Sequence, residues 1–318
     1  MALSVVPCVF SLWYGCATAQ PYPSKAVRVI VPAGPGGGTD LVARVLAQHL
    51  GEALGQQFVV DNRGGAGTTL GSAIAAKAPP DGYTIILHHI SLAFNASYYR
   101  ALPYDTLRDF APITLVATQP FLVVVHPSLP VKSVKELIAL AKSRPGQIAY
   151  GTGGAGSGPH MSAELLKHAA GINLLPVPYK GAGPAFIDLL AGQVQMMIAT
   201  MSLALPHAKA NRVRALAVTS PRRHPAVADL PTVAESGVPG YRFEVWYGLL
   251  APAGTPVSVI QRLNAAAAKI LQARETQERL AGQGLQTITS TPEEFAAYLK
   301  REVETWAKVV QATGLHAD

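Results

Sequence analysis

Three segments rich in glycine and hydroxyl groups contain the residues of this chain that are best suited to bind a ligand. They are Gly34–Thr39, Asn62–Thr69 and Gly151–Gly158, and each precedes a stretch that predicts a helix. A glycine-rich segment before a helix can offer bare main-chain N–H groups and the positive end of the helix dipole. Thr39 or Asp40 is the expected N-cap of the first of these helices. The chemistry that this arrangement favours is the binding of an anion by neutral donors.

Reactive groups are sparse in and around these segments. Gly151–Gly156 matches the pattern GxGxxG, but residues 174–180 lack the acidic residue that a dinucleotide ribose requires. Ser157 does not lie in a GxSxG elbow, because Ala155 occupies the first glycine position. The sequence therefore predicts a binding protein that catalyses no reaction and needs no cofactor. A serine hydrolase that uses Ser157 and His160 is the alternative.

Metal chemistry is disfavoured for a similar reason. His88 and His89 adjoin the end of a predicted strand, where neighbouring side chains point to opposite faces, and no acidic cluster accompanies them. Both cysteines, Cys8 and Cys16, lie within the first 20 residues, so the rest of the chain has no thiol ligand. We expect no metal site.

The elements that must hold the glycine segments alternate between strands and helices. Apolar and β-branched runs predict strands at 27–31, 58–61, 83–87, 121–125, 147–150, 174–177, 195–199, 213–218 and 243–250. Most of the intervening stretches have helical spacing, which predicts an α/β fold with a mostly parallel sheet covered on both faces. The glycine segments follow strands, and open sheets of this class bind ligands at the carboxyl ends of their strands.

The composition is that of a globular chain with a mild basic excess. Of the 318 residues, 49% are hydrophobic and 14% are charged, and the net charge of +7 arises without Lys/Arg runs. Such a chain can form two domains, and its scattered charge favours small anionic partners over nucleic acid.

The first 20 residues predict an export signal. They contain no charged side chain and end in Ala17-Thr18-Ala19, a small-x-small pattern that a signal peptidase can cleave. Trp13 and Tyr14 stand before Cys16 where small or aliphatic residues are expected in a lipoprotein signal. We expect a signal peptide at residues 1–20, a periplasmic location and no lipid anchor.

Six motifs in a fixed order carry a resemblance to a known family. They are YPSKAVRVIVPAGPGGGTD (22–40), VVDNRGGAG (59–67), PPDGYT (79–84), YGTGGAGSGPH (150–160), YKGAGPAFIDLLAGQVQ (179–195) and GLLAPAGTP (248–256). In this order and spacing they resemble the Bug family, the extracytoplasmic solute receptors of tripartite tricarboxylate transporters. The resemblance extends over essentially the whole chain after residue 20.

The resemblance implies a periplasmic binding protein of type II, with two α/β domains and a ligand cleft between them. Domain I would comprise residues 21–116 and 241–318, and domain II residues 117–240. The implied function is the capture of a small organic carboxylate by a monomeric receptor that works with the membrane components of a transporter. A receptor that senses a ligand for a signalling partner is the alternative from within this resemblance.

The resemblance also implies which residues hold the ligand. In the family a ligand carboxylate lies between the domains, bound largely by main-chain groups and water. The matching ligand-binding residues here are Gly36, Gly37, Gly38, Thr39, Thr68, Thr69, Ser91, Gly154, Ala155, Gly156, Ser157, Tyr179, Gly181, Thr200 and Trp246. This chain has Gln195 and Ala199 where family members often have acidic residues. The departure favours plain carboxylates over amino acids as ligands.

Overall fold

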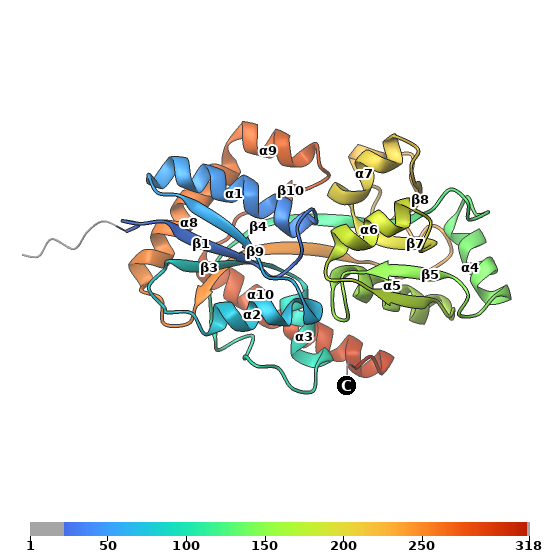
Figure 1. Ribbon diagram of the computed structural model, residues 1–318, viewed down its shortest axis with the longest axis horizontal. Helices are drawn as coiled ribbons and strands as arrows, with labels where there is room; N and C mark the ends of the chain where they lie inside the picture. Colours follow the sequence, from blue (N-terminus) through green and yellow to red (C-terminus); the bar gives the residue numbers. More distant parts are fainter. Residues whose placement is uncertain (1–21, 317–318) are drawn as a thin grey trace, which may run out of the picture.

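The computed structural model describes residues 22–316, which form two lobes connected by a continuous β-sheet (Figure 1). The strand order is β2-β1-β3-β9-β4-β7-β5-β6, and β8 and β10 also pair with β4. We call residues 22–120 and 244–316 the large lobe, and residues 121–243 the small lobe. The predicted signal peptide, residues 1–20, lies outside the described residues, as does Cys16.

The large lobe has helices on both faces of its part of the sheet (Figure 1). Its elements are β1 (Val27–Val31), α1 (Gly38–Leu54), β2 (Phe58–Asn62), the 3-10 turn η1 (Ala66–Thr68), α2 (Thr69–Ala76), β3 (Thr84–His89), α3 (Ser91–Tyr98), α8 (Val257–Gln272), α9 (Arg274–Ala281), β10 (Gln286–Thr287) and α10 (Pro292–Thr313). The apolar stripe of α1 explains its burial, since Val42, Leu46 and Leu50 are all buried. Gly55 ends that helix in the left-handed conformation, with φ at 71°.

The small lobe repeats the same alternation. Its elements are α4 (Val134–Ser143), β5 (Ala149–Thr152), α5 (Gly158–Ala170), β6 (Leu175–Pro178), α6 (Ala182–Leu190), β7 (Met196–Thr200), α7 (Met201–Lys209), β8 (Arg214–Val218) and the 3-10 turn η2 (Pro225–Val227). Ser133 caps α4, as expected, by accepting a hydrogen bond from Glu136 N. Helices cover both faces of this part of the sheet as well (Figure 1).

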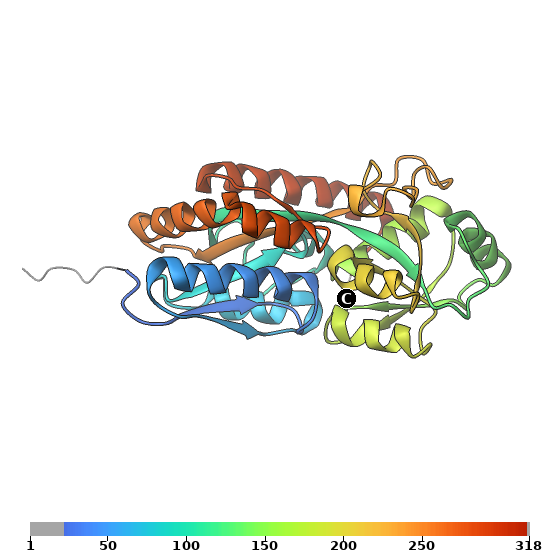
Figure 2. The same ribbon diagram turned by 90° about the horizontal axis from the view of Figure 1, so that it is seen from above.

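One long strand, β4, runs through both lobes. Residues 110–120 of β4 (Phe110–Val125) pair with β9 (Glu244–Pro252) in the large lobe, and residues 121–125 pair with β7 and β8 in the small lobe. Figure 2 shows β4 running from one lobe into the other. The change of partner at Phe121 lies close to the predicted domain boundary at residue 117. The domain bounds remain a prediction, because no break in the strand marks them.

The structure corrects two expectations. The sheet is mixed instead of mostly parallel: β1, β2 and β3 run parallel, as do β5, β6 and β7, whereas β4 pairs with its neighbours in antiparallel fashion. Helix α1 begins at Gly38 with Gly37 as its N-cap, so neither Thr39 nor Asp40 caps it. Among residues 22–316, no helix combines the length and apolar character needed to cross a membrane.

Candidate functional site

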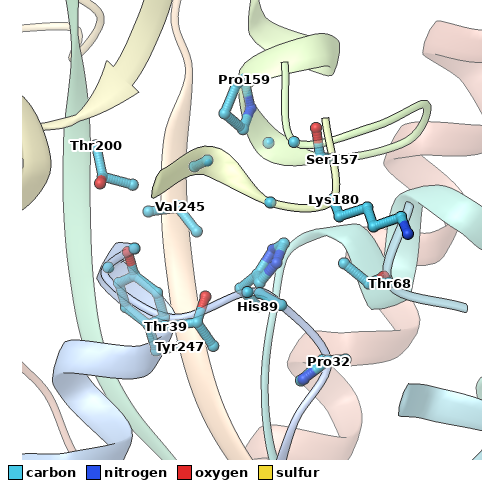
Figure 3. A pocket seen from close by; sticks show the side chains of 18 of the residues that line it. Pro32, Thr39, Thr68, His89, Ser157, Pro159, Lys180, Thr200, Val245 and Tyr247 are labelled. Atoms are coloured by element: carbon cyan, nitrogen blue, oxygen red, sulfur yellow. The ribbon is translucent and has the colours of Figure 1, made fainter. Parts of the chain in front are cut away.

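A pocket lies between the two lobes, at the carboxyl ends of β1 and β3. The space between its walls is about 560 Å³ when the open mouth is counted, of which about 50 Å³ can hold the centre of a water molecule. Figure 3 shows Thr39 and His89 of the large lobe facing Ser157 and Pro159 of the small lobe. The lining residues are Pro32, Ala33, Gly34, Gly37, Gly38, Thr39, Gly65, Thr68, His89, Phe121, Gly153, Ser157, Gly158, Pro159, Lys180, Gly181, Ala182, Thr200, Val245 and Tyr247.

Five helices begin at this pocket. Their N-caps all line it, and in the described structure none of these N-caps uses its side chain to cap its helix: Gly37 of α1, Thr68 of α2, Ser157 of α5, Gly181 of α6 and Thr200 of α7. The first N–H groups of a helix have no partner within the helix, and the helix dipole places partial positive charge there. Five such termini around one cavity make a strong site for an anion.

Few charged side chains contribute to this potential. Among the described residues that line the pocket, only Lys180 is charged at neutral pH, and its side chain is exposed. Arg63 does not line the pocket, because its guanidinium pairs with Asp61 at 2.9 Å. Asp40, in the first turn of α1, accepts a hydrogen bond from Gly36 N at 3.0 Å and pairs with Arg44. The field at the pocket is therefore dominated by main-chain dipoles.

Ser157 lines the pocket and has a buried hydroxyl without a hydrogen-bond partner among the described residues. The residue is 5% exposed. Buried polar atoms are nearly always satisfied in folded proteins, by protein groups or by ligand and water. This atom is consequently a second indication, after the helix N-termini, that a polar ligand binds here.

Asn95 holds Thr68 in an unusual conformation. Thr68 has φ at 86°, in the left-handed region that β-branched residues rarely adopt. The fully buried Asn95 donates through Nδ2 to Gly67 O at 2.8 Å and to Thr68 Oγ1 at 3.1 Å. Strained residues of this kind persist where the surroundings fix them, commonly at ligand sites. Asn95 thus positions the start of α2 at the pocket.

A cluster of hydrogen-bonded polar side chains lies next to Gly38, formed by Tyr247, Gln119 and Ser202. Tyr247 Oη donates to Gln119 Oε1 at 3.1 Å, and Ser202 Oγ donates to the same oxygen at 3.2 Å. A Cβ atom at Gly38 would collide with Tyr247 Oη. Glycine is required at this position because the main chain passes directly over the tyrosine hydroxyl.

The lobes touch beside the pocket through main-chain atoms. A Cβ at Gly67 of the large lobe would collide with the carbonyl oxygen of Ala155 in the small lobe. Tyr99 Oη of the large lobe donates to that same carbonyl at 2.9 Å. On the other side, a Cβ at Gly34 would lie 2.8 Å from Lys180 O. Contacts this close show that the lobes are closed over the pocket.

The structure brings together seven of the predicted ligand-binding residues. Those that line the pocket are Gly37, Gly38, Thr39, Thr68, Ser157, Gly181 and Thr200. Those that do not line it are Gly36, Thr69, Ser91, Gly154, Ala155, Gly156, Tyr179 and Trp246. Gly154, Ala155 and Tyr179 lie together along a second, outer depression between the lobes.

The remaining residues have other partners. Trp246 packs on Phe295 and Tyr298 and donates from Nε1 to Glu302 at 3.0 Å, so the expected apolar wall is formed instead by its neighbour Val245. Thr69 Oγ1 donates to Ala66 O, and Tyr179 Oη donates to Asp188 at 2.6 Å.

Ala199 lies away from the pocket. Ala199 is fully buried in the apolar core of the small lobe and does not line the pocket, whereas the next residue, Thr200, does. The absence of an acidic side chain at position 199 therefore does not indicate whether the ligand carries an amino group.

Ser157 and His160 do not form a catalytic pair. Ser157 Oγ has no hydrogen-bond partner among residues 22–316, while His160 Nδ1 accepts from Gly156 N at 3.3 Å. The His160 ring packs edge-on against Tyr98 at 5.7 Å. The nucleophile therefore lacks the adjacent base that acyl transfer requires. The described residues likewise contain no cluster of three or more His, Cys, Asp or Glu side chains suited to a metal ion.

Several lining residues were missed at the level of sequence, notably His89, Tyr247 and Phe121. Strand alternation was the available signal: in β9, Val245 and Tyr247 share the face that reaches the pocket, and Trp246 points to the other. Which face meets the ligand depends on the pairing of β9 between β3 and β4, which the sequence does not specify.

The chain is similar in sequence to one family of receptors. The family model described as "Tripartite tricarboxylate transporter family receptor" matches residues 42–315. The curated protein BugT of Bordetella pertussis is 38% identical over 299 residues, which cover 93% of this chain and 92% of BugT.

Solved structures with the same fold include proteins with carboxylates bound. The periplasmic binding protein BugD has a TM-score of 0.91 at 36% identity, covering 93% of this chain and 100% of BugD. An adipate-bound protein of R. palustris has a TM-score of 0.89 at 37% identity, with 92% and 98% covered. MatC of Rhodopseudomonas palustris, with bound malate, has a TM-score of 0.88 at 32% identity, with 91% and 100% covered. These matches confirm the predicted fold of a periplasmic binding protein.

Proposed function

The chain belongs to the tripartite tricarboxylate transporter receptor family, and on that premise we propose that its interlobe pocket captures a small organic carboxylate. The family consists of solute receptors, so the protein is a binding protein and not an enzyme. The single observation that carries the proposal is the convergence of five uncapped helix N-termini on one cavity.

A linear dicarboxylate is the ligand class that we favour. Adipate and malate, which are bound in two similar structures, both carry a carboxylate at each end. The pocket here offers N-termini from both lobes, so each lobe can hold one end of such a ligand. The proposed ligand contacts are Gly37, Gly38, Thr39, Thr68, Ser157, Gly181 and Thr200, with Val245 as an apolar wall.

Thermal unfolding with a panel of mono-, di- and tricarboxylates tests the proposal. A ligand present at about a hundred times its dissociation constant stabilises the folded protein by about 2.7 kcal/mol. Ser157→Ala should weaken the best ligand by roughly threefold to tenfold, since a neutral hydrogen bond contributes about 1 kcal/mol. Ser143→Ala, a change at the exposed end of α4, is the control. Turnover of simple esters without a shift by any carboxylate would favour the hydrolase alternative and refute the proposal.

The cellular role extends this proposal. We infer that residues 1–20 are removed on export to the periplasm, that no lipid is attached at Cys16, and that the mature receptor is a monomer. It would then deliver its ligand to membrane components of a tripartite transporter. N-terminal sequencing of periplasmic material should find a chain starting at or near Gln20. Loss of ligand uptake on deletion of the gene would support transport, whereas intact uptake with a lost transcriptional response would support the sensing alternative.

A further inference from the structure

His89 is a pocket-lining side chain whose chemistry the helix N-termini leave unexplained. It is the last residue of β3 and is 7% exposed. Figure 3 shows its ring pointing into the pocket, between Thr68 and Val245. A largely buried ring that lines the pocket is placed to contact a ligand bound there.

Hydrogen bonding selects the tautomer of this ring. The main-chain N–H of Ser91 donates to His89 Nδ1 at 3.3 Å. A neutral imidazole that accepts through Nδ1 carries its proton on Nε2. Nε2 lies at the outer end of the ring, so the ring offers the pocket a single N–H donor. Ser91 acts here through its main chain, and its side chain lies outside the pocket.

The surroundings keep the ring neutral. Burial lowers the pKa of His89 to about 4. The elements packed against β3 carry a small set of titratable side chains, and Lys180 is in the pocket lining. They are His88 on β3, Arg28 on β1, Asp40, Arg44, His49 and Glu52 on α1, Tyr98 on α3, and Glu244 and Tyr247 on β9. Arg28 and Asp40 are each held in an ion pair, with Asp61 and Arg44, while Glu244 and Lys180 are exposed. His88, whose ring centroid lies 5.3 Å away, is bonded to Ser72 Oγ.

We propose that His89 is a specificity-determining residue, which donates from Nε2 to a carboxylate oxygen of the ligand as a fixed, neutral donor. The inference rests on the proposed function, because it assumes a carboxylate in the pocket. In this tautomer Nε2 can donate a hydrogen bond but cannot accept one. A ligand that points an ammonium or hydroxyl proton at Nε2–H therefore leaves two donors facing each other, and neither has a partner. His89 therefore supplies the selection for plain carboxylates that position 199 does not.

Calorimetric titration with adipate and malate tests the role of the ring. His89→Gln keeps an N–H near the position of Nε2 and should bind within about threefold of the wild type, whereas His89→Leu removes it and should lose roughly tenfold or more. Ser91→Ala retains the main-chain N–H and should bind as the wild type does. His207→Gln, which alters a half-buried histidine outside the pocket, is the matched control.

Two further readouts separate a ligand donor from a structural histidine. Nitrogen NMR of the imidazole should show the Nε2–H form before and after ligand addition, with the Nε2 proton shifted by binding. The binding enthalpy should be the same in buffers of different ionisation enthalpy, because the neutral ring exchanges no proton. Unchanged affinity in His89→Leu, or proton uptake on binding, would overturn the inference about His89 but leave the proposed function standing. Failure of every carboxylate to bind the wild type would refute the proposed function and this inference with it.

Discussion

At the scale of single residues, the glycines at the pocket differ in what an added side chain would meet. A Cβ at Gly38 would collide with Tyr247 Oη, whereas a Cβ at Gly37 would meet only Ala182 Cβ, at 3.9 Å. Gly37 also has φ at −88°, which alanine adopts without strain. The two neighbouring glycines therefore make a natural pair for mutation.

We expect Gly38→Ala to abolish ligand binding and Gly37→Ala to reduce it only modestly. The alanine methyl at position 38 must displace either the start of α1 or the Tyr247 side chain, and both shape the pocket. Titration of the two variants with the best carboxylate, after their folding has been checked by circular dichroism, measures the difference. Equal affinities for both variants would contradict the close approach at Gly38.

The sequence predicted part of the pocket at this scale. Glycine segments signalled Gly37, Gly38, Thr39 and Ser157 because composition alone marks a bare main chain before a helix. His89 and Tyr247 could not be recognised in this way, since each is an ordinary strand residue until the sheet order brings it to the pocket.

At the scale of elements, the five helix N-termini mean that helix dipoles, and not charged side chains, supply most of the positive potential at the pocket. Lys180 lines the pocket with an exposed side chain, while Arg63 is paired with Asp61 outside it. Fields from main-chain groups in an enclosed site are screened much less by salt than those of exposed charges.

We expect Lys180→Gln to weaken carboxylate binding by no more than about threefold, because exposed ion pairs contribute little. Arg63→Gln should leave the affinity unchanged. Raising the salt concentration from about 0.05 M to about 0.5 M should also reduce the affinity only modestly. Loss of binding in Lys180→Gln, or a steep salt dependence, would mean that an ion pair holds the ligand.

Helix α10 provides a test of capping that is independent of the ligand. Thr291 Oγ1 accepts from Glu294 N at 3.1 Å, and the Glu294 carboxylate accepts from Thr291 N at 2.8 Å. Thr291→Ala should lower the free energy of unfolding by about 1 kcal/mol. Chemical denaturation measures this effect, and the exposed Thr289→Ala should change stability by less than about 0.5 kcal/mol. A similar loss in both variants would rule out the cap as the cause.

Helices and strands with a clear hydrophobic periodicity could be predicted from the sequence. Elements that form in spite of local signals against them, such as internal prolines, could not. β1 has the predicted bounds, since its β-branched run has no competing signal. The first part of β4 was missed because Pro112 and Pro120 suggest a break, although the strand continues through both. Helix α7 was missed because it contains Pro206, which usually ends a helix.

At the scale of the whole molecule, closure of the lobes depends on a few contacts around the pocket. Tyr99 Oη donates across the gap to Ala155 O at 2.9 Å, near the close approach of Gly67 to the same carbonyl. Because both lobes contribute to the pocket, separation of the lobes at these contacts would widen the path by which a bound ligand leaves.

We expect Tyr99→Phe to raise the dissociation rate of the ligand by roughly twofold to tenfold, with a smaller change in the association rate. Tyr99 Oη also reaches Ala66 O in its own lobe at 3.2 Å, so of its two hydrogen bonds only the one to Ala155 O is specific to the closed form. Stopped-flow binding measures both rates. The control is Tyr83→Phe, which should leave both rates unchanged. Tyr83 directly precedes β3, at the end of that strand away from the pocket, and its hydroxyl is bonded to Ser24. A lower association rate with unchanged dissociation would argue against a role in closure.

Trp246 provides an intrinsic fluorescence signal that can report on ligand binding. It lies on β9 between Val245 and Tyr247, which both line the pocket, and its indole is bonded to Glu302 on α10. The other tryptophan among the described residues, Trp306, lies on the same helix and packs against Phe243. Any bending of β9 that accompanies ligand capture therefore alters the surroundings of an indole. Capture should be visible in the intrinsic fluorescence of the unlabelled protein, so that affinities and rates can be followed by emission alone.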